Sequence, residues 1–192
     1  MHQPFDPAAY GPVFAELLAG DRCRALGPGQ PDRGARDALA GFNSQQAFGG
    51  QSIAEEDMAR LCESGLWLLY DYLDESHTIS QGVHNTSGSY WHAIMHRREP
   101  DESNSKYWFR RVGDHPVYVP LALAARESAE RIGISDASAY LTSGSGWDPF
   151  AFVDLCSAAR RGHAPVEPLC REIQQRECEL LWDYCYRQAV GQ

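Results

Sequence analysis

The chain has 192 residues, a net charge of −9 at pH 7 and a hydrophobic content of 43%. These values predict one globular domain over residues 1–192, from which residues 1–50 can extend as a peripheral arm. A net negative charge repels phosphate backbones and anionic lipid headgroups. We therefore expect neither nucleic acid nor a membrane among the partners.

The sequence also carries no targeting or membrane-spanning pattern. No stretch approaches the roughly 20 apolar residues that cross a bilayer, and the first ten residues lack the basic and then apolar pattern of a signal peptide. We expect a cytoplasmic protein. The six cysteines include no CxxC pair, and we expect them to be small apolar members of a reduced core.

Helix signals recur along the chain. Ser52 and Glu55 have the spacing of a capping box, and Asp148 followed by Pro149 is typical of a helix start. Gly133 suits a helix end. The predicted helices, in chain order, cover residues 6–19, 33–41, 52–73, 89–99, 104–112, 116–132, 148–160 and 167–189. No run alternates with period two, so we predict an all-α, single-domain bundle of about six to eight helices with little or no sheet.

The densest group of chemically active side chains lies in residues 74–99. Residues 74–85 are polar and are expected to be irregular, and a helix follows them. On that helix His96 lies about 40° to one side of His92, and Glu99 lies about 20° to the other. Two imidazoles and a carboxylate on one narrow stripe can hold one metal ion.

This spacing suits zinc or iron, because neutral imidazole nitrogens are good ligands for both ions. We predict His92, His96 and His77 as metal ligands. Glu99 is a further ligand or a general base, and Glu75 from the preceding segment is a second candidate base. The HxxxHxxE pattern lacks the built-in glutamate of HExxH, so it does not identify a protease.

Two other interpretations of the same helix remain open. Tyr90, Trp91, Ile94 and Met95 form an arc wide enough to be its core face, which would leave the histidines in solvent. Alternatively, the histidines belong to a buried polar network. Arg98 and its neighbour fall within or beside the apolar arc, where guanidinium groups need partners or anions.

A second cluster follows in residues 104–116. Tyr107 and Arg111 are four residues apart and share a helix face that can clamp an anion, because guanidinium groups bind carboxylate and phosphate in a bidentate manner. We predict Arg98, Arg110, Arg111 and Tyr107 as substrate-binding residues. The alternative is that Arg110 and Arg111 pair with nearby acidic side chains and join two short helices.

The segments SYWHAIMHRREPD (residues 89–101) and NSKYWFRRVGDHP (residues 104–116) resemble the signature of a family of uncharacterised bacterial proteins. The resemblance covers about 40 residues. No activity is known for that family, so the resemblance implies only that this part of the chain is its signature, and it carries no catalytic roles.

These observations predict a metal-dependent hydrolase that acts on a small anionic substrate. A zinc or iron ion would lower the pKa of a bound water, a glutamate would accept its proton, and arginine would stabilise the developing charge. The first alternative is a non-enzymatic helical binding or scaffold protein with a buried His/Arg/Glu network. The second is a non-haem iron oxidase or oxygenase, which would use the same ligands.

Overall fold

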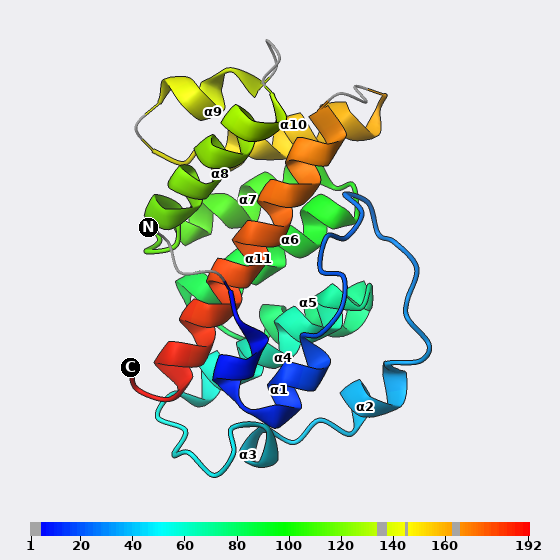
Figure 1. The fold of residues 1–192 in the computed structure, drawn as a ribbon, viewed down its shortest axis with the longest axis vertical. Helices are drawn as coiled ribbons and strands as arrows, with labels where there is room; N and C mark the ends of the chain where they lie inside the picture. The colour runs from blue at the N-terminus through cyan, green and yellow to red at the C-terminus, as the bar shows by residue number, and fades with distance from the viewer. Residues whose placement is uncertain (1–4, 134–137, 145, 163–165) are drawn as a thin grey trace.

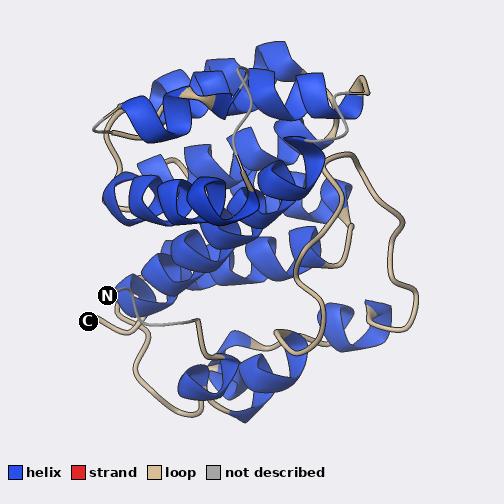
Figure 2. Cartoon of the chain, turned by 45° about the horizontal axis from the view of Figure 1, so that its top comes forward, coloured by secondary structure: helices blue, strands red, loops and turns tan. Residues whose placement is uncertain are grey.

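The structure is a computed structural model that describes residues 5–133, 138–144, 146–162 and 166–192. These residues contain helices and loops and no strand, as Figure 2 shows. A 3-10 helix at Pro7–Tyr10 comes first. The α-helices in this part of the chain are α1 (Pro12–Leu17), α2 (Arg36–Ala40), α3 (Ser44–Ala47), α4 (Glu56–Leu69), α5 (Leu73–Gln81), α6 (Thr86–Arg98), α7 (Glu102–Val112), α8 (Tyr118–Ile132), α9 (Tyr140–Ser143), α10 (Pro149–Arg160) and α11 (Glu167–Ala189).

The all-α prediction is confirmed, but the predicted helix count is too low. The described residues form 11 α-helices, of which seven have seven residues or more. The short helices α2, α3 and α9 have four or five residues each. The helix predicted over residues 33–41 contains α2, whereas α3 and α9 were not predicted, because one turn is too short to display a 3.6-residue hydrophobic period.

The helix predicted over residues 52–73 is shorter, and a second helix follows where an irregular segment was expected. The chain reverses at Asp71, which has a positive φ of 65°, and α5 begins two residues later. The buried face of α5 includes Ser76 and Ser80. The Ser64 hydroxyl donates to the Ser76 carbonyl over 3.0 Å, so this face packs through small polar groups, which hydrophobic periodicity does not reveal.

Other predictions agree with the structure. The last helix, α11, covers the predicted residues 167–189. Asp148 caps α10 by accepting hydrogen bonds from the amides of Phe150 and Ala151, and α8 ends at Gly133, whose φ is 108°. The local chemistry of caps and glycine ends therefore predicts these boundaries well.

The long helix α11 runs along most of the molecule, as Figure 1 shows. It packs against α4, α8 and α10, while α6 packs against α4, α5 and α7. Buried apolar side chains from all of these helices form one cluster. Phe14 and Phe48 belong to this cluster, so the described part of residues 1–50 contributes to the core.

Residues 18–35 connect α1 to α2 without regular structure, and we call this segment the strap. Figure 1 shows that it runs from α1 along the side of the helix bundle and then back toward α2. Side chains of the helices donate to its backbone carbonyls. Arg171 reaches Cys23 O over 2.6 Å, Gln174 reaches Ala25 O over 3.1 Å, and Arg98 reaches Gly27 O over 3.1 Å.

Every residue of α6 from Ser87 to Arg98 is buried. The sequence left open that only the apolar arc of this helix faces the core. In the structure the opposite face, which carries His92 and His96, is buried as well. A Cβ at Gly88 would lie 2.3 Å from the carbonyl oxygen of Val83, so glycine permits the close approach of the preceding loop. The four basic side chains at residues 92 and 96–98 must therefore find their partners inside the protein.

Crossing a bilayer demands a helix that is both long and apolar, and the described part of the chain contains none.

Candidate metal centre

The structure brings three of the predicted ligands together. His77 of α5 meets His92 and His96 of α6, and one ring nitrogen from each lies within 4.8 Å of the other two. His92 and His96 are buried, whereas His77 is half-buried. The cluster therefore lies at the edge of the core, with one of its three imidazoles in contact with solvent.

The two histidines of α6 face each other through the same ring atom. His92 Nε2 lies 3.0 Å from His96 Nε2, because residues four apart on a helix are neighbours. Two nitrogens bound to one tetrahedral zinc ion lie about 3.3 Å apart, given zinc–nitrogen bonds of about 2.05 Å. The spacing of this pair fits such an ion, and a small movement of His77 would complete three ligands.

Glu99 lies beside the outer nitrogen of His96 and away from the point where the imidazoles converge. Its Oε2 is 3.0 Å from His96 Nδ1. A carboxylate accepts a proton here, so Nδ1 carries the hydrogen and Nε2 of a neutral His96 presents its lone pair. The geometry makes Glu99 an orienting partner of His96, in contrast to the predicted role of ligand or general base.

The same logic assigns the proton of His92. If His96 Nε2 is the acceptor, His92 Nε2 must donate to it. His92 Nδ1 is buried and has no hydrogen-bond partner among the described residues, which suits an unprotonated nitrogen better than a buried donor. When both Nε2 atoms bind an ion, the proton of His92 must move to Nδ1.

Both buried imidazoles are held in the neutral form that metal binding requires. Burial, followed by repulsion from His77 and His96, lowers the pKa of His92 to about 3. Burial also lowers the pKa of His96, although Glu99 acts in the opposite direction. At neutral pH these side chains therefore offer lone pairs without first losing a proton.

Aromatic side chains of α7 cover one side of the cluster. The Trp108 ring stacks on His92, with centroids 4.0 Å apart and planes at 23°. The Arg111 guanidinium carbon lies 5.3 Å from the centre of the Trp108 ring, and Tyr107 makes an edge contact with the same indole. Trp108 was not predicted as a site residue, although its position between Tyr107 and Arg111 indicated it.

The predicted substrate-binding residues divide into two groups. Tyr107 and Arg111 are exposed and lie around Trp108. Arg110 lies over the Phe150 ring of α10, at 5.8 Å from its centre, and Arg98 is buried in a structural role. Neither Arg110 nor Arg111 forms an ion pair with an acidic residue in the described part of the chain, so the expected pairing between short helices is absent there.

Arg98 is corrected from a substrate-binding residue to an anchor of the strap. Its Nη2 donates to Asp71 Oδ1 over 2.5 Å, and its Nη1 donates to the Leu68 carbonyl over 2.9 Å. Burial alone would raise the pKa of Asp71, but hydrogen bonds from Arg24 and Arg98 outweigh it and lower that pKa. All three guanidinium nitrogens of Arg98 donate to protein acceptors, and its side chain is only 2% exposed, so the fold uses most of its donors.

Glu75 does not reach the histidines. It lies two residues before His77, about 200° around α5, and its Oε1 accepts from Arg36 Nη1 over 2.6 Å. The prediction of a catalytic base at Glu75 treated residues 74–85 as an irregular segment. A regular helix turns adjacent polar residues to different sides.

A buried serine–histidine contact elsewhere does not make a nucleophile. Ser87 Oγ lies 3.1 Å from His115 Nε2, but His115 Nδ1 accepts the amide hydrogen of Val117 over 3.3 Å. A neutral imidazole whose Nδ1 accepts carries its proton on Nε2. His115 therefore donates to the serine and cannot act as its base in this arrangement.

Comparisons of the chain with protein-family models, with curated protein sequences and with solved structures find no match.

Proposed function

We propose that His77, His92 and His96 bind one divalent metal ion, preferably zinc, and that this centre hydrolyses a small anionic substrate. One observation carries the proposal: three imidazoles from two helices converge within 4.8 Å, and the outer nitrogen of His96 is held by a carboxylate. Histidine ligands of metal sites commonly donate their second N–H to a carboxylate in this way.

The ligand set favours hydrolysis over a purely structural metal. Structural zinc sites use four protein ligands, whereas catalytic sites use three and leave one position for water. Three neutral imidazoles do not offset the charge of the ion, so a divalent metal there lowers the pKa of a coordinated water to about 7. The half-buried His77 gives the cluster its side toward solvent.

Residues of α7 supply the binding surface in this proposal. Arg111 is exposed and has no carboxylate partner in the described ranges, so its guanidinium group is available for an anion. Trp108 forms an apolar wall beside His92, and Tyr107 extends that wall into solvent. Glu99 keeps His96 in the orientation and tautomer that metal binding requires.

The alternative of a non-catalytic polar network is supported by the short contact between His92 and His96, which stabilises the fold without a metal. The same ligands also suit iron, and iron would support an oxidase or oxygenase. Metal content and the response of stability to substitution separate these three cases.

Metal binding is tested by elemental analysis and by titration of the metal-free protein with zinc and cobalt. We expect one ion per chain. His77→Ala, His92→Ala and His96→Ala should each weaken zinc binding by about 100-fold or more. His84→Ala is the matched control, because His84 is exposed and lies outside the cluster.

Two results would contradict the metal site: zinc that binds in no fixed ratio, or a His84→Ala variant that loses as much affinity as the cluster variants. A large loss of stability in metal-free His92→Ala, without any metal binding to the wild-type chain, would establish the network in its place. Stoichiometric iron with a zinc affinity below that for iron would favour the oxidative alternative.

Hydrolysis is tested with the zinc-loaded protein and aryl phosphate and aryl ester substrates that carry a negative charge. Arg111→Gln should raise KM by about tenfold, the effect of losing one charged hydrogen bond. Arg110→Gln removes the same charge from the side chain that lies over Phe150, and it should leave KM unchanged. Absence of turnover with a fully loaded centre would refute the catalytic part alone.

A further inference from the structure

A second site lies on another face of α6. Trp91 and Arg98 line a pocket together with α4, α11 and the strap, whereas none of the clustered histidines does. Trp91 and Arg98 are seven residues apart and share one face of α6, about 120° around the helix from His92 and His96. The pocket is therefore distinct from the candidate metal centre, and nothing about it depends on a metal.

The walls of this pocket are apolar. Leu68 and Leu69 come from α4, Trp91 from α6, and Cys178 and Trp182 from α11. About 480 Å³ of empty space lies in the pocket and in the open solvent at its mouth. A small ligand would fit the inner part once the covering segment moves.

Glycine at position 65 lets the two tryptophans close around the pocket. A Cβ at Gly65 would lie 2.8 Å from the Trp91 ring and 2.9 Å from the Trp182 ring. Any other residue would displace one or both indoles. Both rings therefore pack closely on α4 and form an aromatic part of the pocket wall, which suits an apolar group.

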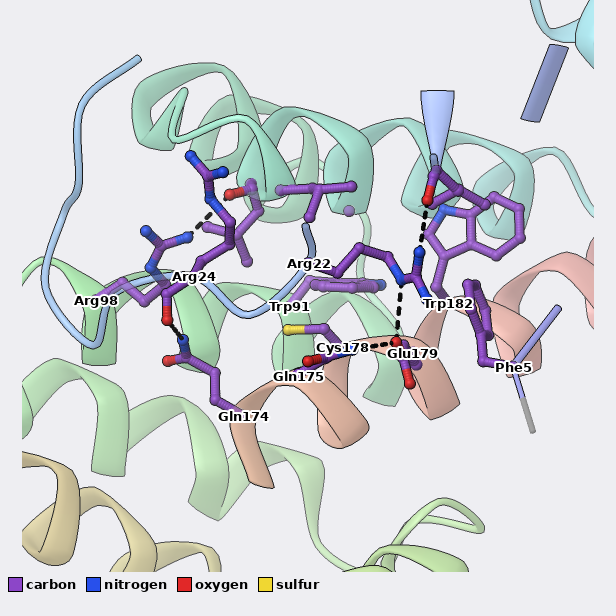
Figure 3. A pocket seen from close by; sticks show the side chains of 14 residues that line it. Phe5, Arg22, Arg24, Trp91, Arg98, Gln174, Gln175, Cys178, Glu179 and Trp182 are labelled. Atoms are coloured by element: carbon purple, nitrogen blue, oxygen red, sulfur yellow. Dashed lines mark hydrogen bonds and ion pairs between the residues drawn. The ribbon is translucent and has the colours of Figure 1, made fainter. Parts of the chain in front are cut away.

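The mouth of the pocket has an excess of positive charge. Arg22, Arg24 and Arg98 line it with one carboxylate, that of Glu179. Arg24 and Arg98 share a second carboxylate, that of Asp71, which does not line the pocket. Figure 3 shows Arg22 reaching across the pocket toward Glu179. Glu179 already accepts from Arg22, from Gln175 over 2.8 Å and from Arg176 over 3.2 Å, so it has little capacity left to attract a cation.

Arg22 retains a donor for an anion. Its Nε donates to Glu179 over 3.0 Å and its Nη1 donates to the Leu18 carbonyl over 2.8 Å. Its Nη2 has no hydrogen-bond partner within the described ranges. An anionic group at the mouth would therefore meet a guanidinium edge that the fold does not use.

The covering segment can move without unfolding a helix. Leu18, Arg22 and Arg24 of the strap, with Phe5, close the pocket over the helices. The strap has no regular structure, and side-chain donors hold its carbonyls in place. Loops of this length in compact proteins are commonly functional.

From these features we propose that the pocket binds a small apolar monocarboxylate, with its hydrocarbon part against Trp91 and Trp182 and its carboxylate on Arg22. Aromatic and short aliphatic acids share this chemistry. The pocket thus adds a ligand-binding site on α6 to the candidate metal centre, with separate residues.

The test uses the full chain, with 3-phenylpropionate and hexanoate as probes and 3-phenylpropan-1-ol as the neutral analogue. Binding is followed by calorimetry and by the indole N–H signals of the five tryptophans in NMR spectra. We expect the signals of Trp91 and Trp182 to shift in a saturable way. The signal of Trp108, which lies at the histidine cluster, should not move.

Two matched pairs of variants locate the ligand. Cys178→Leu fills the pocket and should weaken binding of the acids by about tenfold or more. Cys23→Leu is its control, because Cys23 is also half-buried but does not line the pocket. Arg22→Gln should weaken the acids by about tenfold and leave the alcohol unchanged, whereas Arg187→Gln on the exposed end of α11 should affect neither.

The proposal is overturned if the Trp91 and Trp182 signals do not shift at millimolar probe, or if Trp108 shifts in their place. It is also overturned if Cys178→Leu and Cys23→Leu bind equally well. If Cys178→Leu does not fold, the wild-type indole shifts and the Arg22→Gln pair still decide the outcome. A preference for hexanoate over 3-phenylpropionate would identify the aliphatic members of the class.

Discussion

Helix α6 carries two pairs of buried basic residues whose surroundings differ. Arg97 and Arg98 are matched with carboxylates from distant elements, Glu177 and Asp71. His92 and His96 contact mainly other imidazoles, an indole and one solvent-exposed glutamate. Buried charge that is neutralised by the fold serves structure, whereas neutral imidazoles that converge and bond to one another can exchange that bond for a ligand.

The largest expected effect concerns the arginine side of this comparison. Glu177→Gln leaves the fully buried Arg97 without its counter-charge, and Tyr90 also loses its charged acceptor, now 3.0 Å away. We expect a loss of about 3–5 kcal/mol in the free energy of unfolding, measured by urea denaturation. Glu130→Gln, on the exposed side of α8, is the control. A loss below about 1 kcal/mol would show that the pair is not structural.

The pH dependence of stability tests whether the buried histidines are neutral in the folded protein. Burial lowers the pKa of His115 to about 4, while an unfolded histidine titrates near 6.5. The unfolded state therefore binds the proton first, so stability is present above pH 6.5 and is lost as the pH falls toward 4. We expect about 2.5 kcal/mol less stability at pH 4.5 than at pH 7 from this residue.

His115→Asn should reduce this slope, whereas His84→Asn on the surface should not. Metal-free His92 titrates still lower and adds a loss of the same sign. A stability that does not change between pH 7 and pH 4.5 would show that these imidazoles are not buried in the neutral state.

Glu99 tests whether the histidine pair is prepared for a metal. Glu99→Gln keeps a hydrogen-bond acceptor beside His96 Nδ1 but removes the charge. Substitutions of such outer partners weaken metal binding by about 10–100-fold, and we expect a loss in this range for zinc, measured by competition with a chelator. Glu130→Gln should bind zinc as the wild-type chain does. Equal zinc affinity in the two variants would mean that Glu99 does not support a ligand.

The smallest expected effect is a change in the tautomer of His92, which alters the free energy of the protein little. In the metal-free chain we expect the proton of His92 on Nε2 and that of His96 on Nδ1. Zinc should shift the His92 proton to Nδ1 while His96 stays unchanged, which nitrogen chemical shifts report directly. A His92 proton already on Nδ1 before zinc is added would contradict the hydrogen-bond assignment.

The sequence predicts the roles of these four buried basic residues only in part. The helical interval between His92 and His96 is local, so their common face follows from residue numbers alone. The roles of Arg97 and Arg98 are not local, because Glu177 and Asp71 lie 80 and 27 residues away along the chain. Without the fold, a buried arginine with a distant partner looks the same as one that awaits a substrate.

The structure of α5 escaped prediction for a related reason. Its buried contacts involve Ser76 and Ser80, so the segment has no clear apolar period. His77 was selected as a ligand because it is near the other histidines in the sequence. The structure places it with them because α5 packs against α6, which residue spacing alone cannot establish.

The backbone carbonyls of the strap are held by hydrogen bonds, whereas several of its backbone amides are not. Its carbonyls from Cys23 to Pro28 accept from arginine and glutamine side chains, yet the amides of Ala25, Leu26 and Gly27 donate to no described group. Amide hydrogen exchange requires a free N–H, whatever the carbonyl does. Deuterium should therefore enter this segment rapidly even while it remains in place, and its exchange rate would report solvent access to single amides instead of opening of the bundle.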